Sequence, residues 1–276
     1  MVIRISDLCV LTATIASLIL VEAVAKAEII ASSNFTSFAN GNLVSQNGWQ
    51  QLGTVATVPI QVSAGAVTWA RPAAAANDQD AILPFSALIS EPLAGTTILN
   101  FDMTLSVATA GSPPSFFAGL NTLNTTATTG NFANSRLVVQ SSGAGFVFGS
   151  RVTGQAGFPF AFGTDVFNFN QTYALRAEVN MVAGAQNDFV RILAGNDFNN
   201  LTLQTTAVFT TGVGTDPTSY GAIVLSQFDS GTAFQAGVTI NSVSVTAVPE
   251  PTSTALIGCA VLSAAFIRYR RRCTQA

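Results

Sequence analysis

The chain has 276 residues, of which 9% are charged, and its formal net charge is −3 at pH 7. It contains no histidine, which excludes Ser-His-Asp triads and histidine metal sites. Its only lysine and its three cysteines lie in the two terminal segments, so Schiff-base and thiol chemistry are excluded from the long central part.

Residues 1–27 are typical of a secretory signal peptide. Arg4 provides the positive start, Leu8–Val21 is a mostly apolar run, and Ala25 and Ala27 fit the small-residue pattern before a cleavage point. The segment predicts an N-terminal signal helix, export through the Sec pathway and removal of these residues. An uncleaved N-terminal membrane anchor is the alternative.

Residues 28–247 are expected to form one exported all-β domain. Apolar and polar side chains alternate over Ile98–Val107 and Tyr173–Met181, as in strands that bury one face. The alternation over Phe234–Ala247 changes phase at Asn241-Ser242, which suggests a bulge. Shorter candidate strands are Ala66–Ala70, Leu137–Gln140, Phe146–Phe148, Phe189–Leu193, Leu201–Thr205 and Tyr220–Phe228.

Glycine and asparagine turn signals separate these strands, and no helical periodicity of useful length lies between them. The pattern predicts an antiparallel β-sandwich or jelly roll. Ala110–Pro114 and Asn121–Asn134 are expected to be long polar loops.

Two stretches of this domain show a family pattern. The first comprises Phe35, Gly41-Asn42-Leu43 and Gln46-Asn47-Gly48-Trp49, and the second is Tyr173–Val179 followed by Asn187–Ile192. They resemble the opening and the central hairpin of concanavalin-like jelly rolls from exported bacterial proteins. The resemblance implies that the first and last strands of the domain lie close together.

Carboxylate chemistry is what the composition leaves open, since glycoside hydrolysis uses a pair of acidic side chains. Concanavalin-like glucanases place alternating acids on one strand, whereas Glu178 is followed on the same face by Asn180 and Val182. Asp78-Gln79-Asp80 does alternate acids, but it is expected to lie in a polar, alanine-rich loop. These observations predict no catalytic residue and a protein that is not an enzyme.

Few residues of the domain are candidates for ligand binding. Asp188 and Asp197 flank one short strand and are candidates for calcium, which binds oxygen ligands. Turn formation explains them more simply, and no other cofactor is expected. Trp49 and Trp69 can either stack on a sugar or fill the core.

The central part of the chain is acidic. Residues 28–247 carry five arginines against eleven acidic residues, a net charge of −6. Nucleic-acid binding requires clustered Lys and Arg, and no basic patch is expected outside the C-terminal tail. Nucleic acid is therefore not predicted as a partner.

Residues 248–276 combine three features in order: the triplet Pro249-Glu250-Pro251, the apolar stretch Thr254–Ile267 and a group of arginines. These arginines are Arg268, Arg270, Arg271 and Arg272. An apolar helix beside arginines is held in a membrane with the arginines on the cytoplasmic side. The tail therefore predicts a C-terminal transmembrane helix.

This order of features resembles a PEP-CTERM sorting domain. The resemblance implies processing near the triplet by an exosortase-type membrane enzyme, after a transient stay in the inner membrane of a Gram-negative bacterium. Delivery to the cell surface or the extracellular matrix follows, and extracellular polysaccharide is a further expected partner. A permanent C-terminal anchor is the alternative.

The sequence as a whole predicts an exported protein with a structural or glycan-associated, non-enzymatic role. A lectin-like carbohydrate-binding module is the first alternative. A glycoside hydrolase of concanavalin-like fold is the second.

Overall fold

The computed structural model describes residues 27–52, 59–69, 80–112, 114–126, 135–152, 160–185, 187–208, 217–229 and 236–249. The predicted signal helix and the predicted transmembrane helix, with Ala25, Glu250, Pro251 and the arginines of the tail, lie outside these ranges. Within the ranges, no helix is long and apolar enough to cross a membrane. One compact unit comprises Glu28–Ala247.

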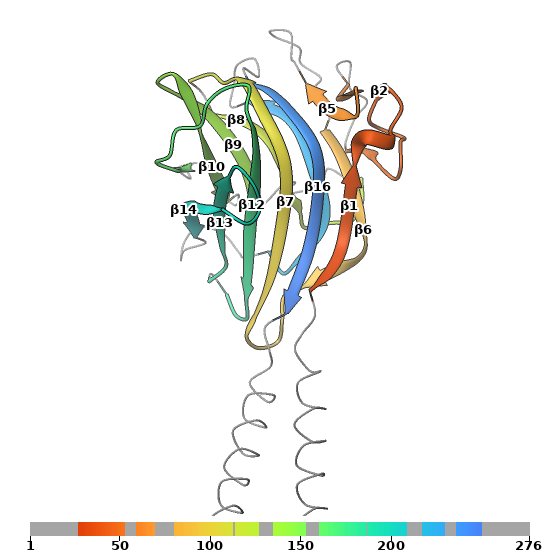
Figure 1. Cartoon of the computed structure of the whole chain (residues 1–276). Helices are drawn as coiled ribbons and strands as arrows, with labels where there is room; N and C mark the ends of the chain where they lie inside the picture. The colour runs from red at the N-terminus through yellow and green to blue at the C-terminus, as the bar shows by residue number, and fades with distance from the viewer. Residues whose placement is uncertain are drawn as a thin grey trace, which may run out of the picture. The chain divides into compact units, whose positions relative to one another are not determined.

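This unit is a sandwich of two antiparallel sheets (Figure 1). Among the described residues, sheet A has nine strands in the order β14-β13-β12-β7-β16-β5-β4-β2, with β1 also paired to β16. They are β1 (Glu28–Asn34), β2 (Gly41–Asn42), β4 (Gln61–Ser63), β5 (Ala66–Trp69), β7 (Thr96–Thr109), β12 (Thr172–Val182), β13 (Phe189–Gly195), β14 (Thr202–Val208) and β16 (Gly237–Pro249).

Sheet B has seven strands in the described ranges, in the order β11-β10-β9-β8-β15-β6-β3. They are β3 (Gln50–Leu52), β6 (Asp80–Ser90), β8 (Ser115–Asn121), β9 (Ser135–Ser142), β10 (Gly145–Val152), β11 (Ala161–Phe162) and β15 (Ser219–Asp229). A 3-10 helix, η1 (Phe35–Ser37), follows β1. The predicted all-β sandwich is therefore confirmed.

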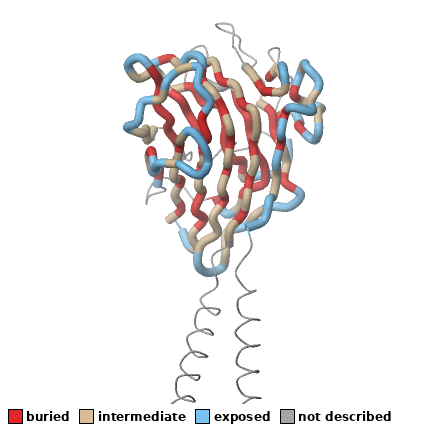
Figure 2. The backbone as a smooth tube through the Cα atoms, in the orientation of Figure 1, coloured by how far each residue is buried: buried red, intermediate tan, exposed pale blue. Residues whose placement is uncertain are grey.

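Sheet A follows the alternation that the sequence predicts. Along β7, Leu99, Phe101 and Met103 are buried while the residues between them are partly exposed. Its neighbour β12 alternates in the same way from Leu175 to Val179, so both strands turn one face to the core (Figure 2). One buried face and one wet face are the usual arrangement in an antiparallel sheet.

The last strand, β16, confirms the predicted change of phase. Buried positions shift from Val238 and Ile240 to Val243 and Val245. The pairing partner of β16 also changes at this point. Residues Val238–Ile240 pair with β5, and residues Ser242–Ala247 pair with β1. The pairing of β1 with β16 bears out the expected contact of the first and last strands.

Sheet B departs from the expected pattern because its neighbouring strands β8 and β15 are buried on both faces. All seven residues of β8 are buried, so the strand shows no polar alternation and was not predicted. The structure also corrects the loop expected at Asp80, which is the first residue of β6. Asp78 lies outside the described residues.

The hairpin of β12 and β13 was expected at the centre of the sandwich. The two strands do pair, with Glu178 opposite Arg191. They lie toward the β14 edge of sheet A, however, with β13 next to the edge strand. The central position was therefore wrong, while the hairpin itself is confirmed.

Aromatic side chains fill the space between the sheets. Phe146 contacts the rings of Phe148, Phe167, Phe169 and Tyr173, with ring centroids 5.1 to 6.0 Å apart. Edge-on and tilted contacts of this kind add to the stabilisation from area burial. These rings join strands from both sheets into one core.

The core predicts the effect of removing a ring. Phe101 is fully buried in β7, whereas Phe198 is 39% exposed. Phe101→Ala should lower the free energy of unfolding by about 3–5 kcal/mol, because it leaves a cavity between the sheets. Phe198→Ala is the matched control and should change it by less than about 1 kcal/mol.

Urea unfolding of residues 27–249, which contain every described strand, measures both changes. Equal losses for the two variants would contradict the assigned core.

Candidate functional site

Two arginines meet on the outer face of sheet B. In the β9–β10 hairpin, Arg136 lies directly opposite Arg151. Leu137, next to Arg136, and Phe148, three residues before Arg151, belong to the core between the sheets. Because side chains alternate along a strand, the arginine pair points to the other face, with Cβ atoms roughly 4.5–5.5 Å apart.

Each arginine of the pair lies over an aromatic ring. The guanidinium carbon of Arg136 is 5.1 Å from the ring centroid of Phe116. That of Arg151 is 5.1 Å from the centroid of Phe160. A guanidinium is planar, and two of its N–H groups match the two oxygens of a carboxylate.

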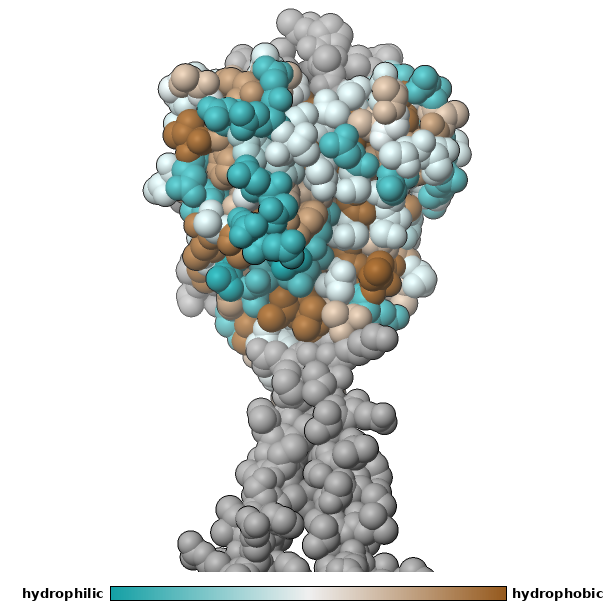
Figure 3. All heavy atoms as spheres, viewed as in Figure 1, coloured by the Kyte–Doolittle hydropathy of each residue, from teal (hydrophilic) through white to brown (hydrophobic). Residues whose placement is uncertain are grey.

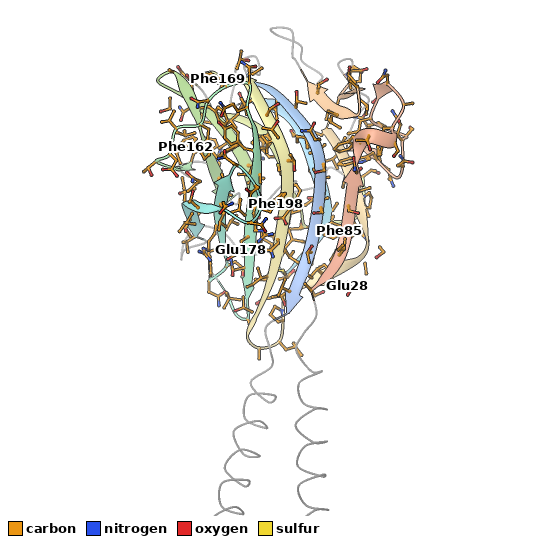
Figure 4. The ribbon with its side chains drawn as sticks, viewed as in Figure 1. Glu28, Phe85, Phe162, Phe169, Glu178 and Phe198 are labelled. Atoms are coloured by element: carbon orange, nitrogen blue, oxygen red, sulfur yellow. The ribbon has the colours of Figure 1, made fainter. Side chains whose placement is uncertain are left out.

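A small apolar cluster supports these rings. Phe116 and Val138 are buried, and Phe160 and Phe162 pack against them. Phe162 lies over Gly149, where an added Cβ would come within 2.5 Å of the Phe162 ring. The glycine therefore lets β11 lie against β10, where Figure 4 shows Phe162.

A row of paired residues connects the arginine pair to the rest of sheet B. Arg136 pairs with Gly119, Gly119 with Val224, and Val224 with Ile82. Val224 and Ile82 are fully buried in a second apolar cluster on this face. Gly119 places no side chain in the row between Arg136 and this second cluster.

The charge of the site is set by three groups. Burial, together with the nearby positive charge of Arg151, lowers the pKa of Arg136 to about 10, although the charge of Asp80 acts in the opposite direction. Asp80 itself accepts a hydrogen bond from the Ser226 hydroxyl at 2.5 Å. At neutral pH Arg136 keeps its charge, so two positive charges stand against the one of Asp80.

This pair corrects the expectation that no basic patch exists outside the tail. Arg136 and Arg151 are separated in the sequence by most of the β9–β10 hairpin, and strand pairing brings them together. The prediction against nucleic acid stays a prediction, and it now rests on the net charge of −6 over residues 28–247.

The outer face of sheet A carries paired charges instead. Arg176 donates from Nε and Nη2 to the two carboxylate oxygens of Asp102 at 2.6 and 2.7 Å. Arg191 donates to Glu178 at 2.8 Å. The hydrogen bonding of Arg176 to the Asp102 carboxylate is the main cause that raises the pKa of Arg176. Hydrophilic residues cover the middle of this face (Figure 3).

Phe198 extends this polar face with an exposed ring. The guanidinium carbon of Arg176 is 6.0 Å from its centroid. Figure 4 shows Phe198 in front of sheet A, with Glu178 below it. Because Asp102 and Glu178 are both bound by arginines, they are committed to structural ion pairs on this face.

The two calcium candidates lie at opposite ends of β13. Asp188 is fully buried and accepts a hydrogen bond from the Val182 amide at 2.7 Å. Asp197 accepts hydrogen bonds from the side chain of Asn200 and the amide of Asn199, which lower its pKa. This is ordinary turn chemistry.

The strand between the two aspartates is seven residues long, or roughly 24 Å, so they cannot share one calcium ion. Within the described ranges, no group of three acidic or cysteine side chains could hold a metal. Calcium binding by either aspartate alone stays a prediction.

Trp49 belongs to the core rather than to a sugar site. It is 1% exposed, its ring centroid lies 6.0 Å from that of Phe35, and its Nε1 donates to the Ser33 hydroxyl at 3.2 Å. Trp69 lies on β5, and its side chain is outside the described part of the chain. A lectin-like function therefore cannot rest on Trp49.

Comparison with known proteins gives likeness in fold alone. No family model matches the sequence, and no curated protein matches it. A sialidase structure has a TM-score of 0.47 at 14% identity, over 82% of this chain and 19% of the sialidase chain. This chain therefore spans about a fifth of that protein.

Two further structures cover nearly the whole of their own chains. An alginate lyase, Aly36B, has a TM-score of 0.45 at 11% identity, over 80% of this chain and 97% of the lyase. The CBM2 module of the evolved Dit protein of Lactobacillus casei BL23 phage J-1 has a TM-score of 0.47 at 12% identity, over 81% of this chain and 96% of the module. These are carbohydrate-active β-sandwich proteins.

These likenesses correct one prediction. The protein was expected not to be an enzyme, and the similar structures include a sialidase and an alginate lyase. That expectation is contradicted. At this level of identity the likeness concerns the fold, and it assigns no reaction to this chain.

The arginine pair predicts a repulsive coupling. Like charges directly opposite each other in a sheet destabilise it, and opposite charges stabilise it. A double-mutant cycle with Arg136→Gln and Arg151→Gln should give a coupling of about 0.2–1 kcal/mol of repulsive sign. The Asp102→Asn and Arg176→Gln cycle on sheet A is the control and should give an attractive coupling.

Both couplings should shrink in high salt, because salt screens partly exposed charges. An attractive or absent coupling between Arg136 and Arg151 would mean that the two charges do not meet as described.

Proposed function

We propose that this chain is an exported surface protein whose sandwich binds an extracellular polysaccharide through the outer face of sheet B. The observation that carries the proposal is the arginine pair, with each guanidinium over a ring. Sugars offer apolar ring faces to aromatic side chains and oxygen acceptors to arginine donors. This is the lectin-like alternative of the sequence analysis, with the arginine pair in place of the tryptophans as the binding site.

The surroundings of the pair fit this role. Three partly exposed residues lie near it: Gln140 on β9, Phe162 on β11, and Phe160 immediately before β11. Phe160 and Phe162 contact each other with ring centroids 5.9 Å apart. Rings, an amide and two fixed guanidinium groups are the kinds of group that line carbohydrate sites, where a few polar groups orient a ligand on an apolar floor.

The terminal segments support the exported location. We propose that residues 1–27 direct the chain through the Sec pathway and that the tail holds it transiently in the inner membrane. An exosortase-type enzyme then acts near Pro249-Glu250-Pro251 and releases the protein to the surface of a Gram-negative cell. The support is the order of triplet, apolar stretch and arginine cluster.

Binding is tested with the exported protein recovered from the host cell surface and applied to an array of bacterial and plant polysaccharides. The proposal predicts a defined subset of bound glycans. Arg136→Gln with Arg151→Gln should weaken that binding, while Phe198→Ala on the other face should leave it unchanged. A flat array for the wild-type protein would overturn the proposal.

Processing is tested separately by intact-mass analysis of the same exported protein. The expected mass lacks residues 1–27 and the arginines from Arg268 to Arg272. A surface species that still carries those arginines would show that the tail is a permanent anchor.

A further inference from the structure

We infer that the arginine pair is an anion site for the carboxylate of a sparsely charged acidic polysaccharide, such as one with a single uronic acid in each repeat. This inference rests on the proposed function and narrows it to a class of ligand. It is carried by the strand register that sets Arg136 opposite Arg151 and by the rings of Phe116 and Phe160 beneath them.

The two sheets use the same construction with opposite charge patterns. On sheet A, strand register places each arginine opposite an acid, as in the pairs Arg176–Asp102 and Arg191–Glu178. On sheet B, register places an arginine opposite an arginine. The second arrangement lowers stability, so folding alone does not account for it.

Partial burial adds to the cost of the pair. Both arginines are partly buried, and a buried charge is stabilised only when a counter-charge or hydrogen bonds compensate for lost water. The Nε of Arg151 is buried and donates to no acceptor among the described residues. Because this atom is buried, a ligand oxygen can reach only the other N–H groups of the partly exposed Arg151 side chain.

The rings limit the directions from which an anion can approach. The guanidinium carbons of Arg136 and Arg151 each lie 5.1 Å from a ring centroid, over Phe116 and Phe160, so an anion has to approach from a side that the ring does not cover. The remaining N–H groups lie in the planes of the two guanidinium groups. A planar carboxylate can accept from such groups through both of its oxygens, and it can bridge the pair because the two side chains start from facing positions.

Charge around the pair limits how many anions the ligand can carry. Asp80 acts on Arg136 electrostatically with the sign opposite to that of Arg151. Residues 28–247 as a whole carry a net charge of −6. A densely charged polymer is repelled by this field, whereas one with widely spaced carboxylates can place a single group at the pair.

The flanking side chains favour a sugar as the carrier of the carboxylate. The rings of Phe160 and Phe162 are partly exposed beside Arg151. A pyranose attached to the bound carboxylate has an apolar face that can lie on them. A small inorganic anion would leave the exposed parts of these rings in water.

The test compares ligands that differ only in charge, using the full chain in detergent micelles. Its probes are neutral fully methyl-esterified pectin, partly esterified pectin with spaced carboxylates, and fully charged polygalacturonate. We expect the partly esterified polymer to bind about tenfold more tightly than the neutral one. Polygalacturonate should bind more weakly than the partly esterified polymer at low salt.

Matched variants assign the effect to the pair. Arg136→Gln with Arg151→Gln should remove the preference for the charged pectin, whereas Arg176→Gln with Arg191→Gln on sheet A should keep it. Arg151→Lys keeps the charge and loses the planar fork, so it should lose most of the preference even if the double variant fails to fold.

The outcomes separate the two proposals. Equal binding of neutral and partly esterified pectin, or a preference that survives Arg151→Lys, overturns the anion site and leaves polysaccharide binding in place. Tighter binding of dextran sulfate than of partly esterified pectin overturns the assignment to a carboxylate. Binding of no polysaccharide at all in the array overturns the proposed function itself.

Discussion

The register of the antiparallel strands decides which charges meet in this protein. Five arginines lie in residues 28–247, and register places two of them opposite acids on sheet A and two opposite each other on sheet B. A shift of one residue in any of these pairings would turn the side chains to the other face of the sheet. The apolar alternation that fills the core therefore also fixes the charges outside it.

The two sheets differ in what covers their outer faces. Sheet A has the usual single buried face, and its outer face is a polar surface held by ion pairs. Sheet B buries residues on both faces, including Val224 and Ile82 in the second apolar cluster. Burying a charged group in such apolar surroundings costs free energy unless the group is paired. The arginines of sheet A are paired with acids and have a structural role, whereas Arg136 and Arg151 face each other on sheet B and are candidates for ligand binding.

Much of sheet A could be predicted from the sequence, because β7, β12 and β16 show the alternation of half-buried strands. β8 could not, since burial of both faces removes the alternation. The site was missed for a related reason. Arg136 and Arg151 lie just outside the predicted short strands Leu137–Gln140 and Phe146–Phe148 and belong to no motif, and their contact depends on the register of one hairpin. Trp49 was a sugar candidate by type, and its burial beside Phe35 assigns it to the core.

The account depends most on a carboxylate at the arginine pair, and the arginine side chains can report it directly. The measurement is an NMR titration of the Nε–Hε signals of nitrogen-labelled protein with trigalacturonate. The signals of Arg136 and Arg151 should move together and saturate, while those of Arg176 and Arg191 stay in place. Signals of the pair that do not move, or larger shifts on sheet A, would contradict the assignment of the site to sheet B.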